Sequence, residues 1–364
     1  MKLRLTAAAG LGAVLLLTAC AANEPPAQPA GADTPGETTA ATLSGTIAGK
    51  GASSAKVAQE AWTAAFQIAN GGVTINYSPD GSGAGREAFM QGGADFAGSD
   101  RALKLDENVA GAFAGCTDAS TAIDVPIYVS PIAIIFKVDG VTDLNLTPEL
   151  VAQIFRGDIS NWNDPAIAAV NPGVTFPDLA ITAVHRSDKS GTTGNFTEYL
   201  AVAAGGAWTD EPSEEWPLAT GEAAKGTSGV VSAVTGGSGT IGYADASQAG
   251  AAGIAKIGPE GAFAAPTHED VMKALEASPL EEGRADNDIV IALDRTAEGY
   301  PLMLVSYGIA CAEYKDTAQG DLVKAYFGYI ASEEGQTTAA ETAGSTPLSP
   351  ALRDKVLAAI GTIK

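Results

Sequence analysis

Three segments of the chain place glycine together with serine or threonine at the expected start of a helix. The segments are "GKGASSAKVAQEAW", "DGSGAGREAFMQ" and "SDKSGTTGNF". The residues concerned are Ser53, Ser54, Ser82, Ser190, Gly191 and Thr192. A helix N-terminus carries unpaired backbone N–H groups and a partial positive charge, glycine lets the backbone approach a ligand, and a hydroxyl adds a donor. This combination suits the binding of an oxyanion.

An arginine strengthens the interpretation of the third segment. Serine or threonine at a helix start is more often only an N-cap. Arg186, however, lies just before that segment, and its guanidinium can hold a tetraoxyanion through two N–H groups. Asp188 follows two residues later and could fix the orientation of Arg186. If the two residues formed a surface ion pair instead, they would contribute almost nothing to stability.

A carboxylate is also expected at this site. Asp100 ends the segment "DFAGSD", where a short strand is predicted to end, a common position for binding residues in α/β folds. A carboxylate repels an anion unless a proton lies between them. Monohydrogen phosphate carries such a proton and sulfate at neutral pH does not. Asp100 would therefore favour a protonated oxyanion.

Length and charge limit the class of protein. The chain has 364 residues, which is enough for two domains, and 46% of them are hydrophobic. Its formal net charge is −22, which argues against a nucleic-acid partner because few cations remain to neutralise phosphates. An anion site in such a protein must be local and made of directed hydrogen bonds.

The elements that must position these residues alternate between strands and helices. Apolar residues recur at helical spacing in "SSAKVAQEAWTAAFQIA". The helix in "LTPELVAQIFRGD" has Thr147 as N-cap, Pro148 first and Gly157 as its stop. The alternation predicts an α/β fold. Two long apolar stretches, "VPIYVSPIAIIFKV" and "YPLMLVSYGIACAEY", are either ordinary core strands or the paired crossovers of a two-domain hinge.

The N-terminus has the layout of an export signal. Two cations precede a short apolar run that ends in "LTAC", similar to the bacterial lipobox, in which Cys20 is lipid-modified and becomes the first mature residue. An ordinary secretory signal cut near Ala19 is the alternative. Residues 21–42 are rich in proline, alanine, threonine and acid, and predict a disordered tether with a reach of roughly 25 Å. Cys116 and Cys311 of an exported chain are expected to form a disulfide, with two buried free thiols as the alternative.

The chain resembles the phosphate-binding proteins of high-affinity phosphate ABC transporters. The matching segments run in order over most of the mature chain: "GKGASS", "DGSGAG", "DFAGSD", "VSPIAIIFKV", "LTPELVAQIFRGDISNWNDPAI", "HRSDKSGTTGNF", "SGTIGYAD" and "YPLMLVSYGI". The "SGTT" segment with its preceding arginine and the "IFRGDISNWNDP" stretch are specific to this family. The resemblance implies an α/β, two-domain periplasmic binding protein fold of type II, a clamshell with two crossover hinge strands.

The resemblance also implies a set of phosphate ligands. By motif, these are Ser53, Ser54, Ser82, Asp100, Arg186, Ser190, Gly191 and Thr192, with Asp188 orienting the arginine. The sequence departs from other members at two places. Ser53 and Ser54 stand where some members have Thr-Phe, and Lys189 stands where others have glycine or an acid.

Domain boundaries follow from the same resemblance. Residues 1–20 would be the signal peptide with its lipobox, and residues 21–42 the tether. Domain 1 would comprise residues 43–127 and 300–364, and domain 2 residues 128–299.

The expected function is capture of inorganic phosphate and its delivery to the permease subunits of an ABC importer. The protein would be a monomer, anchored through Cys20 at the outer face of the cell membrane, without cofactor or metal. Catalysis is not expected, since His185 and His268 lie in no metal-spaced cluster and no G-x-S-x-G segment occurs. Binding of another oxyanion, such as sulfate or molybdate, and a sensing or adhesive role are the alternatives.

Overall fold

The computed structural model describes residues 43–364. The predicted signal peptide, the lipid site at Cys20 and the tether lie outside the described residues. None of the helices in the described range combines the length and apolar character of a membrane span.

The N-terminal part of the described chain alternates strands and helices, as predicted. Its elements are β1 (Ser44–Gly51), α1 (Lys56–Ala69), β2 (Gly72–Ser78), α2 (Ser82–Met90) and β3 (Phe96–Ser99). Strand β1 pairs in parallel with both β2 and β3. Helices connect these parallel strands, so the C-terminal ends of the strands lie at the same edge of the sheet.

Two long, buried strands form the centre of the sheet. They are β4 (Ala122–Lys137) and β11 (Met303–Cys311), which pair antiparallel. Strand β4 changes its partners along its length, because residues up to Pro131 pair with β11 and residues from Ile132 pair with β8. The apolar stretches are therefore strands covered on both faces, and β4 runs through both groups of strands.

The middle of the chain builds a second group of elements. These are β5 (Asn145–Leu146), α3 (Pro148–Arg156), α4 (Pro165–Ala169), β6 (Thr182–Arg186), α5 (Gly191–Ala203), η1 (Gly205–Ala207), β7 (Glu222–Ala224), α6 (Gly226–Gly236), β8 (Thr240–Asp245), η2 (Ala246–Gln248), β9 (Gly253–Ile254), β10 (Lys256–Ile257) and α7 (His268–Ala277). The predicted limits of α3 are confirmed. Thr147 accepts a hydrogen bond from the N–H of Leu150, and Gly157 ends the helix at a φ of 84°.

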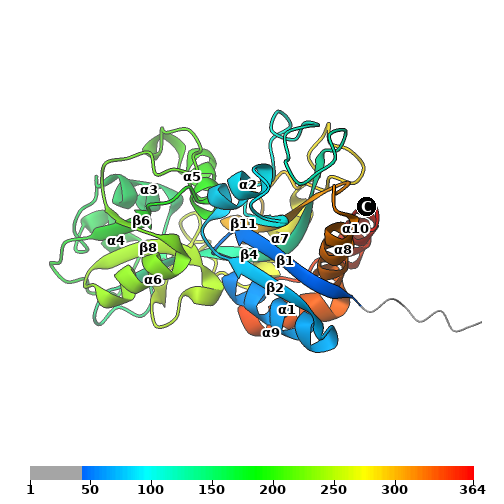
Figure 1. Ribbon diagram of the computed structural model, residues 1–364. Coiled ribbons are helices and arrows are strands. Elements are labelled where there is room, and N and C mark those ends of the chain that lie inside the picture. The colour runs from blue at the N-terminus through cyan, green and yellow to red at the C-terminus, as the bar shows by residue number, and fades with distance from the viewer. Residues whose placement is uncertain (1–42) are drawn as a thin grey trace, which may run out of the picture. The chain divides into compact units, whose positions relative to one another are not determined.

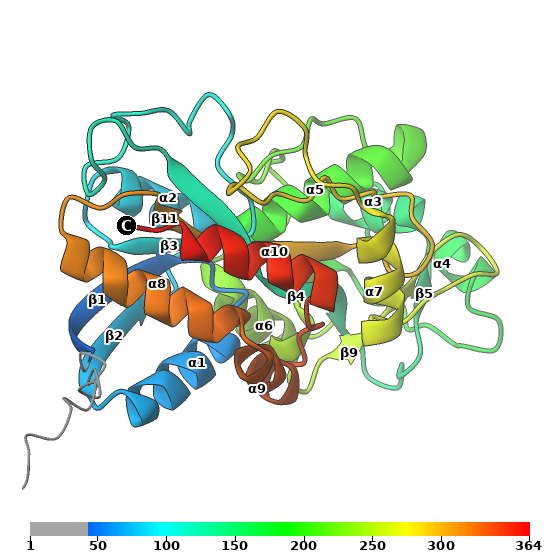
Figure 2. The same cartoon turned by 90° about the vertical axis from the view of Figure 1, so that its right-hand side faces the viewer.

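The chain closes with three helices, α8 (Thr317–Ala331), α9 (Glu333–Ala343) and α10 (Pro350–Gly361). Helices α8 and α10 lie side by side (Figure 1 and Figure 2). We call β1–β3 with α1, α2 and α8–α10 the first lobe, and β6–β8 with α3, α5 and α6 the second lobe; Figure 1 shows the two groups.

The main sheet confirms the α/β prediction. Its strand order is β2-β1-β3-β11-β4-β8-β6-β7, with β9 paired to β4. Aromatic residues fill each lobe. In the first lobe Phe96 packs on Phe327, with ring centroids 5.4 Å apart, and in the second lobe Phe196 stacks on Tyr243 at 4.3 Å. These aromatic residues of both lobes belong to one continuous apolar core.

Cys116 and Cys311 form a disulfide, the pairing expected for an exported chain. The bridge joins positions 195 residues apart, next to the central strands. By loop entropy such a bridge stabilises the folded chain by about 5 kcal/mol. We expect a Cys116→Ser, Cys311→Ser variant to melt well below the wild type in thermal unfolding. Addition of reductant should lower the wild-type midpoint toward that of the variant, and equal midpoints without reductant would contradict the expectation.

Candidate functional site

Asp100 is the residue at which three predicted segments meet. Its carboxylate accepts hydrogen bonds from the Ser54 hydroxyl at 2.7 Å and from the Thr192 hydroxyl at 2.9 Å, and its backbone N–H donates to Ser82 Oγ at 3.1 Å. Asp100 is only 3% exposed. Burial raises the pKa of its carboxyl group, while the hydroxyls and the positive charge of Arg186 oppose that rise. The structure therefore brings the first, second and third segments to one buried carboxylate.

The arginine and aspartate of the third segment form a buried pair. Nε of Arg186 donates to Asp188 Oδ1 at 2.8 Å and Nη2 donates to Oδ2 at 2.5 Å. The Arg186 side chain is 2% exposed, so the pair is not the surface ion pair considered from sequence. Burial opposes ionisation of Asp188, but hydrogen bonds from Arg186 and its charge lower the pKa of the carboxyl group below its usual value. The pair fixes the guanidinium plane and leaves Nη1 outside it.

The starts of the three helices differ in local structure. Ser190 is the N-cap of α5, and its hydroxyl accepts from the N–H of Thr193 at 3.2 Å. Ser82 is the first residue of α2. Ser53 and Ser54 precede α1, which has no side-chain cap. Ser190 is thus an N-cap as well as a candidate ligand, whereas the hydroxyls of Ser54 and Ser82 are engaged with Asp100.

Two glycines at the site have no room for a side chain. A Cβ at Gly191 would lie 2.7 Å from both the Cβ of Asp100 and the hydroxyl of Ser82. Gly81 has a φ of +105°, and a Cβ there would lie 2.5 Å from a carboxylate oxygen of Asp188. The two lobes therefore lie too close together at this point for a side chain at either glycine.

Ser53 and Ser54 have different environments. The Ser53 hydroxyl lies 3.1 Å from Thr227 Oγ1 and also accepts from the N–H of Thr227, so it faces α6 of the second lobe. The amide of Gln248 donates to the carbonyl oxygens of both serines. Helix α6 begins with "GTSG". This composition is that of the three selected segments, yet sequence reasoning did not select it.

Two further side chains of the site were also missed. Asn195 donates to the carbonyl oxygens of Asp100 at 2.7 Å and of Gly191 at 2.9 Å. The Tyr243 hydroxyl accepts from the N–H of Arg186 at 3.2 Å and shares a hydrogen bond with Thr193 Oγ1 at 2.7 Å. Burial raises the pKa of Tyr243 to about 12, so its hydroxyl keeps its proton. Asn195 lies four residues after Gly191 on α5. This spacing was the only local feature of the sequence that could have indicated a role for Asn195 at the site.

The remaining sequence candidates lie beside the site, since the Lys189 carbonyl accepts the N–H of Gly83 at 3.1 Å and Nδ1 of His185 lies 2.9 Å from the Arg186 carbonyl oxygen. Lys189 is exposed, and its side chain runs along Gly83, where an added Cβ would lie 2.6 Å from it. His185 stacks on Trp216 with centroids 4.9 Å apart, and burial lowers its pKa. Within residues 43–364, no group of three or more His, Cys, Asp or Glu side chains is placed to hold a metal ion.

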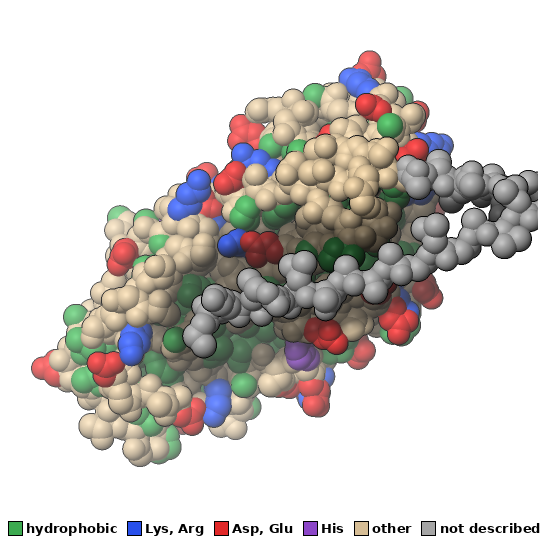
Figure 3. All heavy atoms as spheres, turned by 60° about the horizontal axis from the view of Figure 1, so that its bottom comes forward, with side chains coloured by type: hydrophobic (Ala, Val, Ile, Leu, Met, Phe, Trp, Pro, Cys, Tyr) green, Lys and Arg blue, Asp and Glu red, His purple; other side chains and the backbone are tan. Residues whose placement is uncertain are grey.

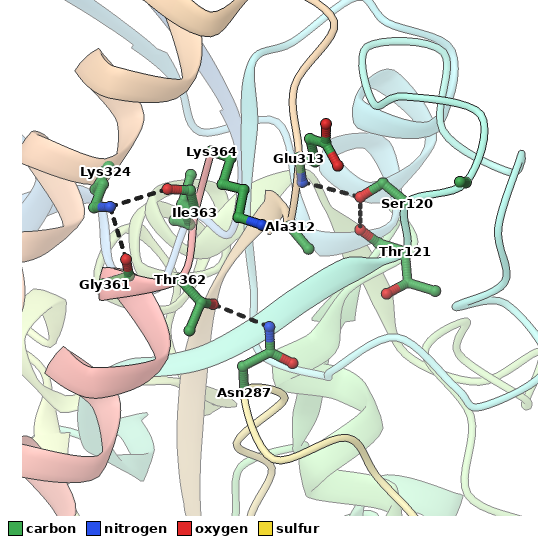
Figure 4. Close-up of a pocket in the computed structure, with 11 residues that line it drawn as sticks. Ser120, Thr121, Asn287, Ala312, Glu313, Lys324, Gly361, Thr362, Ile363 and Lys364 are labelled. Carbon is green, nitrogen blue, oxygen red and sulfur yellow. Dashed lines mark hydrogen bonds between the residues drawn. The ribbon is translucent and has the colours of Figure 1, made fainter.

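A surface pocket of about 650 Å³ lies elsewhere on the first lobe (Figure 4). It is lined by side chains such as Ser120, Asn287 and Lys324 and by the C-terminal residues, and by none of the predicted ligands. On the face shown in Figure 3, cationic side chains are scattered among acidic ones and form no basic patch. Charge at an anion site must come from Arg186 and from oriented N–H and O–H groups.

Asp245 is a second buried carboxylate, at the end of β8. It is fully buried and accepts hydrogen bonds from the hydroxyls of Tyr128 and Ser247. Burial raises its pKa to about 7. In the unfolded chain an aspartate titrates near 4, so between about pH 4 and 7 the folded state binds this proton more tightly than the unfolded state. The contribution of Asp245 to the free energy of unfolding is therefore full at low pH and falls as the pH rises to about 7.

This titration predicts a pH-dependent difference between the wild type and Asp245→Asn. The wild type should lose up to about 4 kcal/mol from this group between pH 4 and 8, whereas the amide cannot titrate. Thermal unfolding of both proteins at pH 5 and pH 8 measures the difference. We expect the melting temperature of the variant, relative to that of the wild type, to be higher at pH 8 than at pH 5. A difference in melting temperature that is the same at both pH values would contradict the assignment.

Residues 36–334 match the family model of the PBP superfamily domain. The phosphate-binding protein PstS 3 of Mycobacterium leprae is 38% identical over 293 residues, 77% of each chain, and PstS 2 of Mycobacterium tuberculosis is 35% identical over 324 residues, 86% of each chain. The solved phosphate-binding protein from Stenotrophomonas maltophilia has a TM-score of 0.70 at 21% identity, with 86% of this chain and 93% of that chain covered.

The fold is therefore the two-domain α/β fold of the type II periplasmic binding proteins, as the sequence predicts. Within that superfamily, the chain belongs to the PstS family of phosphate-binding proteins.

Proposed function

We propose that the protein captures inorganic phosphate between its two lobes and delivers it to the permease subunits of an ABC importer. The observation that carries this proposal is the buried Asp100 carboxylate, which accepts hydrogen bonds from the hydroxyls of Ser54 and Thr192, residues of opposite lobes. The charge of Arg186 acts on the same carboxyl group. A carboxylate, a fixed cation and several donors at the ends of three helices form a site for an oxyanion that carries a proton.

Binding would exchange one set of hydrogen bonds for another. The hydroxyls of Ser54 and Thr192, which now donate to Asp100, would turn to phosphate oxygens. Asp100 would accept the proton of monohydrogen phosphate in their place, so its carboxylate would not be left without a donor. The N–H groups at the start of α5 and Arg186 would hold the remaining oxygens. Ser53, Ser82, Ser190 and Gly191 complete the proposed ligand set, and Asp188 orients the guanidinium.

We propose the two domains as residues 43–127 with 300–364, and residues 128–299, joined by β4 and β11. Hydrogen bonds to first-lobe residues argue for one change at the end of the second range. Ile289 donates to the carbonyl of Asp124, and Arg284 donates to that of Leu103. The part of the return segment around these two residues, about residues 281–291, is thus proposed to move with the first lobe during hinge closure, whereas Arg295 pairs with Glu198 of α5 in the second lobe at 2.7 Å.

The cellular setting is also a proposal. The lipobox-like "LTAC" supports lipid attachment at Cys20, which would keep the protein at the outer face of the cell membrane with residues 21–42 as a tether. The Cys116–Cys311 disulfide is consistent with an extracytoplasmic place. The protein would act as a monomer without a cofactor. It would bind and release phosphate without chemical change.

Equilibrium dialysis with radiolabelled phosphate tests this function. We expect saturable binding of one phosphate per chain, competition by arsenate, and no competition by sulfate at neutral pH. The discrimination against sulfate also separates phosphate capture from the alternative of a sulfate or molybdate carrier. Competition by sulfate equal to that by phosphate, or no saturable binding, would refute the proposal.

A further inference from the structure

The loop between α5 and β7 carries Glu214 of the second lobe onto two arginines of the first lobe. Its Oε2 accepts from Arg86 Nη2 at 2.6 Å and from Arg101 Nε at 3.0 Å. The side chains of Arg86 and Glu214 are 4% and 10% exposed. The contact is therefore a buried ionic link between the lobes, and none of the proposed phosphate ligands takes part in it.

Each member of this link is connected to the site through the backbone. Arg86 lies on α2, the helix that begins with Ser82, and Arg101 directly follows Asp100. The backbone carbonyl of Glu214 accepts the N–H of Ser190, the N-cap of α5, at 2.9 Å. The contact between Glu214 and the two arginines therefore also connects the chain segments that carry the proposed ligands of both lobes.

Closure strengthens the preference of Glu214 for its charged form. Burial alone would favour the neutral acid, but the charges and hydrogen bonds of Arg86 and Arg101 lower the pKa of the carboxyl group below its usual value. With the lobes apart, the three charges would return to water and the attraction would weaken. Among the described residues, Glu214 Oε1 is buried without a hydrogen-bond partner.

We propose that Glu214 is a positioning residue for phosphate binding, because its ion pairs with Arg86 and Arg101 hold the lobes closed around the ligand. The inference rests on the proposed function. A ligand whose binding-competent state is closed has an apparent affinity that scales with the population of that state. Loss of the link lowers this population, and phosphate leaves faster because it escapes from the open protein.

The experiment compares Glu214→Gln with the matched variant Glu107→Gln. Glu107 also pairs with Arg101, at 2.8 Å, but lies in the same lobe as that arginine. Stopped-flow binding of inorganic phosphate gives the association and dissociation rates of both variants and the wild type. We expect Glu214→Gln to raise the dissociation rate by about 10- to 100-fold, less than truncation of a buried charged partner would, because the amide oxygen of glutamine can still accept a hydrogen bond; Glu107→Gln should change it by less than about twofold.

The direction of the change separates closure from simple electrostatics. Glu214→Gln removes a negative charge near an anion site, so a purely electrostatic role predicts tighter phosphate binding. A dissociation rate within about twofold of the wild type, or tighter binding, overturns the proposal. If Glu214→Gln does not fold, Glu214→Asp keeps the charge on a shorter side chain and should give an intermediate rate. An unchanged rate in that variant overturns the proposal as well.

Small-angle scattering of the phosphate-free proteins tests the ionic link between the lobes independently of the proposed phosphate binding. If the wild type binds no phosphate, the proposed function fails and the ionic link is judged by scattering alone. A larger radius of gyration for Glu214→Gln than for the wild type and Glu107→Gln supports the link. Equal radii for all three proteins overturn it.

Discussion

Replacement of Arg186 by alanine is expected to weaken phosphate binding by roughly 3–5 kcal/mol, about 150- to 5,000-fold in Kd. Arg186 is the one fixed cation among the proposed ligands, and its side chain is 2% exposed. Without it, Asp188 would keep a negative charge beside the anion, with the N–H of Gly226 as its remaining donor within the described contacts. The loss of phosphate affinity therefore has two causes: the attraction between Arg186 and the anion is removed, and the repulsion between Asp188 and the anion is no longer compensated. Calorimetric titration of phosphate measures the difference.

Arg156→Ala is the matched control for this variant. Arg156 lies in the same lobe and pairs with Asp210 at 2.7 Å, but its side chain is 28% exposed. An exposed pair of this kind contributes little, so phosphate affinity should stay at the wild-type value. If Arg186→Ala binds phosphate nearly as well as the wild type, the anion site is not at the start of α5.

Replacement of Asp100 by asparagine is expected to remove most of the discrimination between phosphate and sulfate. In the wild type, sulfate would leave the carboxylate without a donor and set two negative groups face to face. Sites left with buried unpaired polar groups reject the wrong ligand by roughly 10⁴–10⁵. An asparagine could turn its N–H₂ group toward a sulfate oxygen, and the hydroxyls of Ser54 and Thr192 could still reach the side chain. Phosphate affinity should change much less than sulfate affinity.

Titration of both anions into both proteins, at two pH values, measures this selectivity. Burial raises the pKa of Asp100. As the pH is lowered, Asp100 should therefore become protonated before an exposed aspartate does. A protonated carboxyl group can donate to sulfate. Exclusion of sulfate should therefore weaken at acid pH in the wild type and stay constant in the variant. If Asp100→Asn excludes sulfate as strongly as the wild type does, Asp100 is not the selectivity residue.

The parts of the site that the sequence predicted depend on local chemistry. Ser190 follows the rules for an N-cap, and Gly191 and Gly81 stand where the backbone comes too close for a side chain. Asp100 lies directly after a strand, where side chains of α/β proteins commonly face a ligand. Such features are encoded within a few residues of the chain, so they are visible before the fold is known.

The parts that the sequence did not predict depend on contacts between distant segments. Tyr243 meets Arg186 across 57 positions, and Glu214 meets Arg86 across 128. Neither residue is unusual in its own segment. Ser53 and Ser54 show the same limit, because adjacent serines of one segment face different partners. Only the approach of the two lobes decides which side chain of a segment faces which partner.

The fold followed a similar division. The strands β4 and β11 were visible as apolar stretches because they are covered on both faces. Their role as crossovers could not be separated from that of ordinary core strands by composition. The change of partners at Ile132 depends on pairing with β8, which begins about a hundred residues later. Two-residue strands such as β5 and β10 carry too little periodicity to be predicted.

A crystal structure of the arsenate complex, with the anomalous signal of arsenic, tests the central claim most directly. Arsenate has the shape and the proton of phosphate, so it should occupy the same site. We predict one strong anomalous peak between the lobes, within hydrogen-bonding distance of Asp100, Arg186 and the start of α5. A principal peak elsewhere, for example in the pocket beside Ser120 and Lys324, would contradict the account.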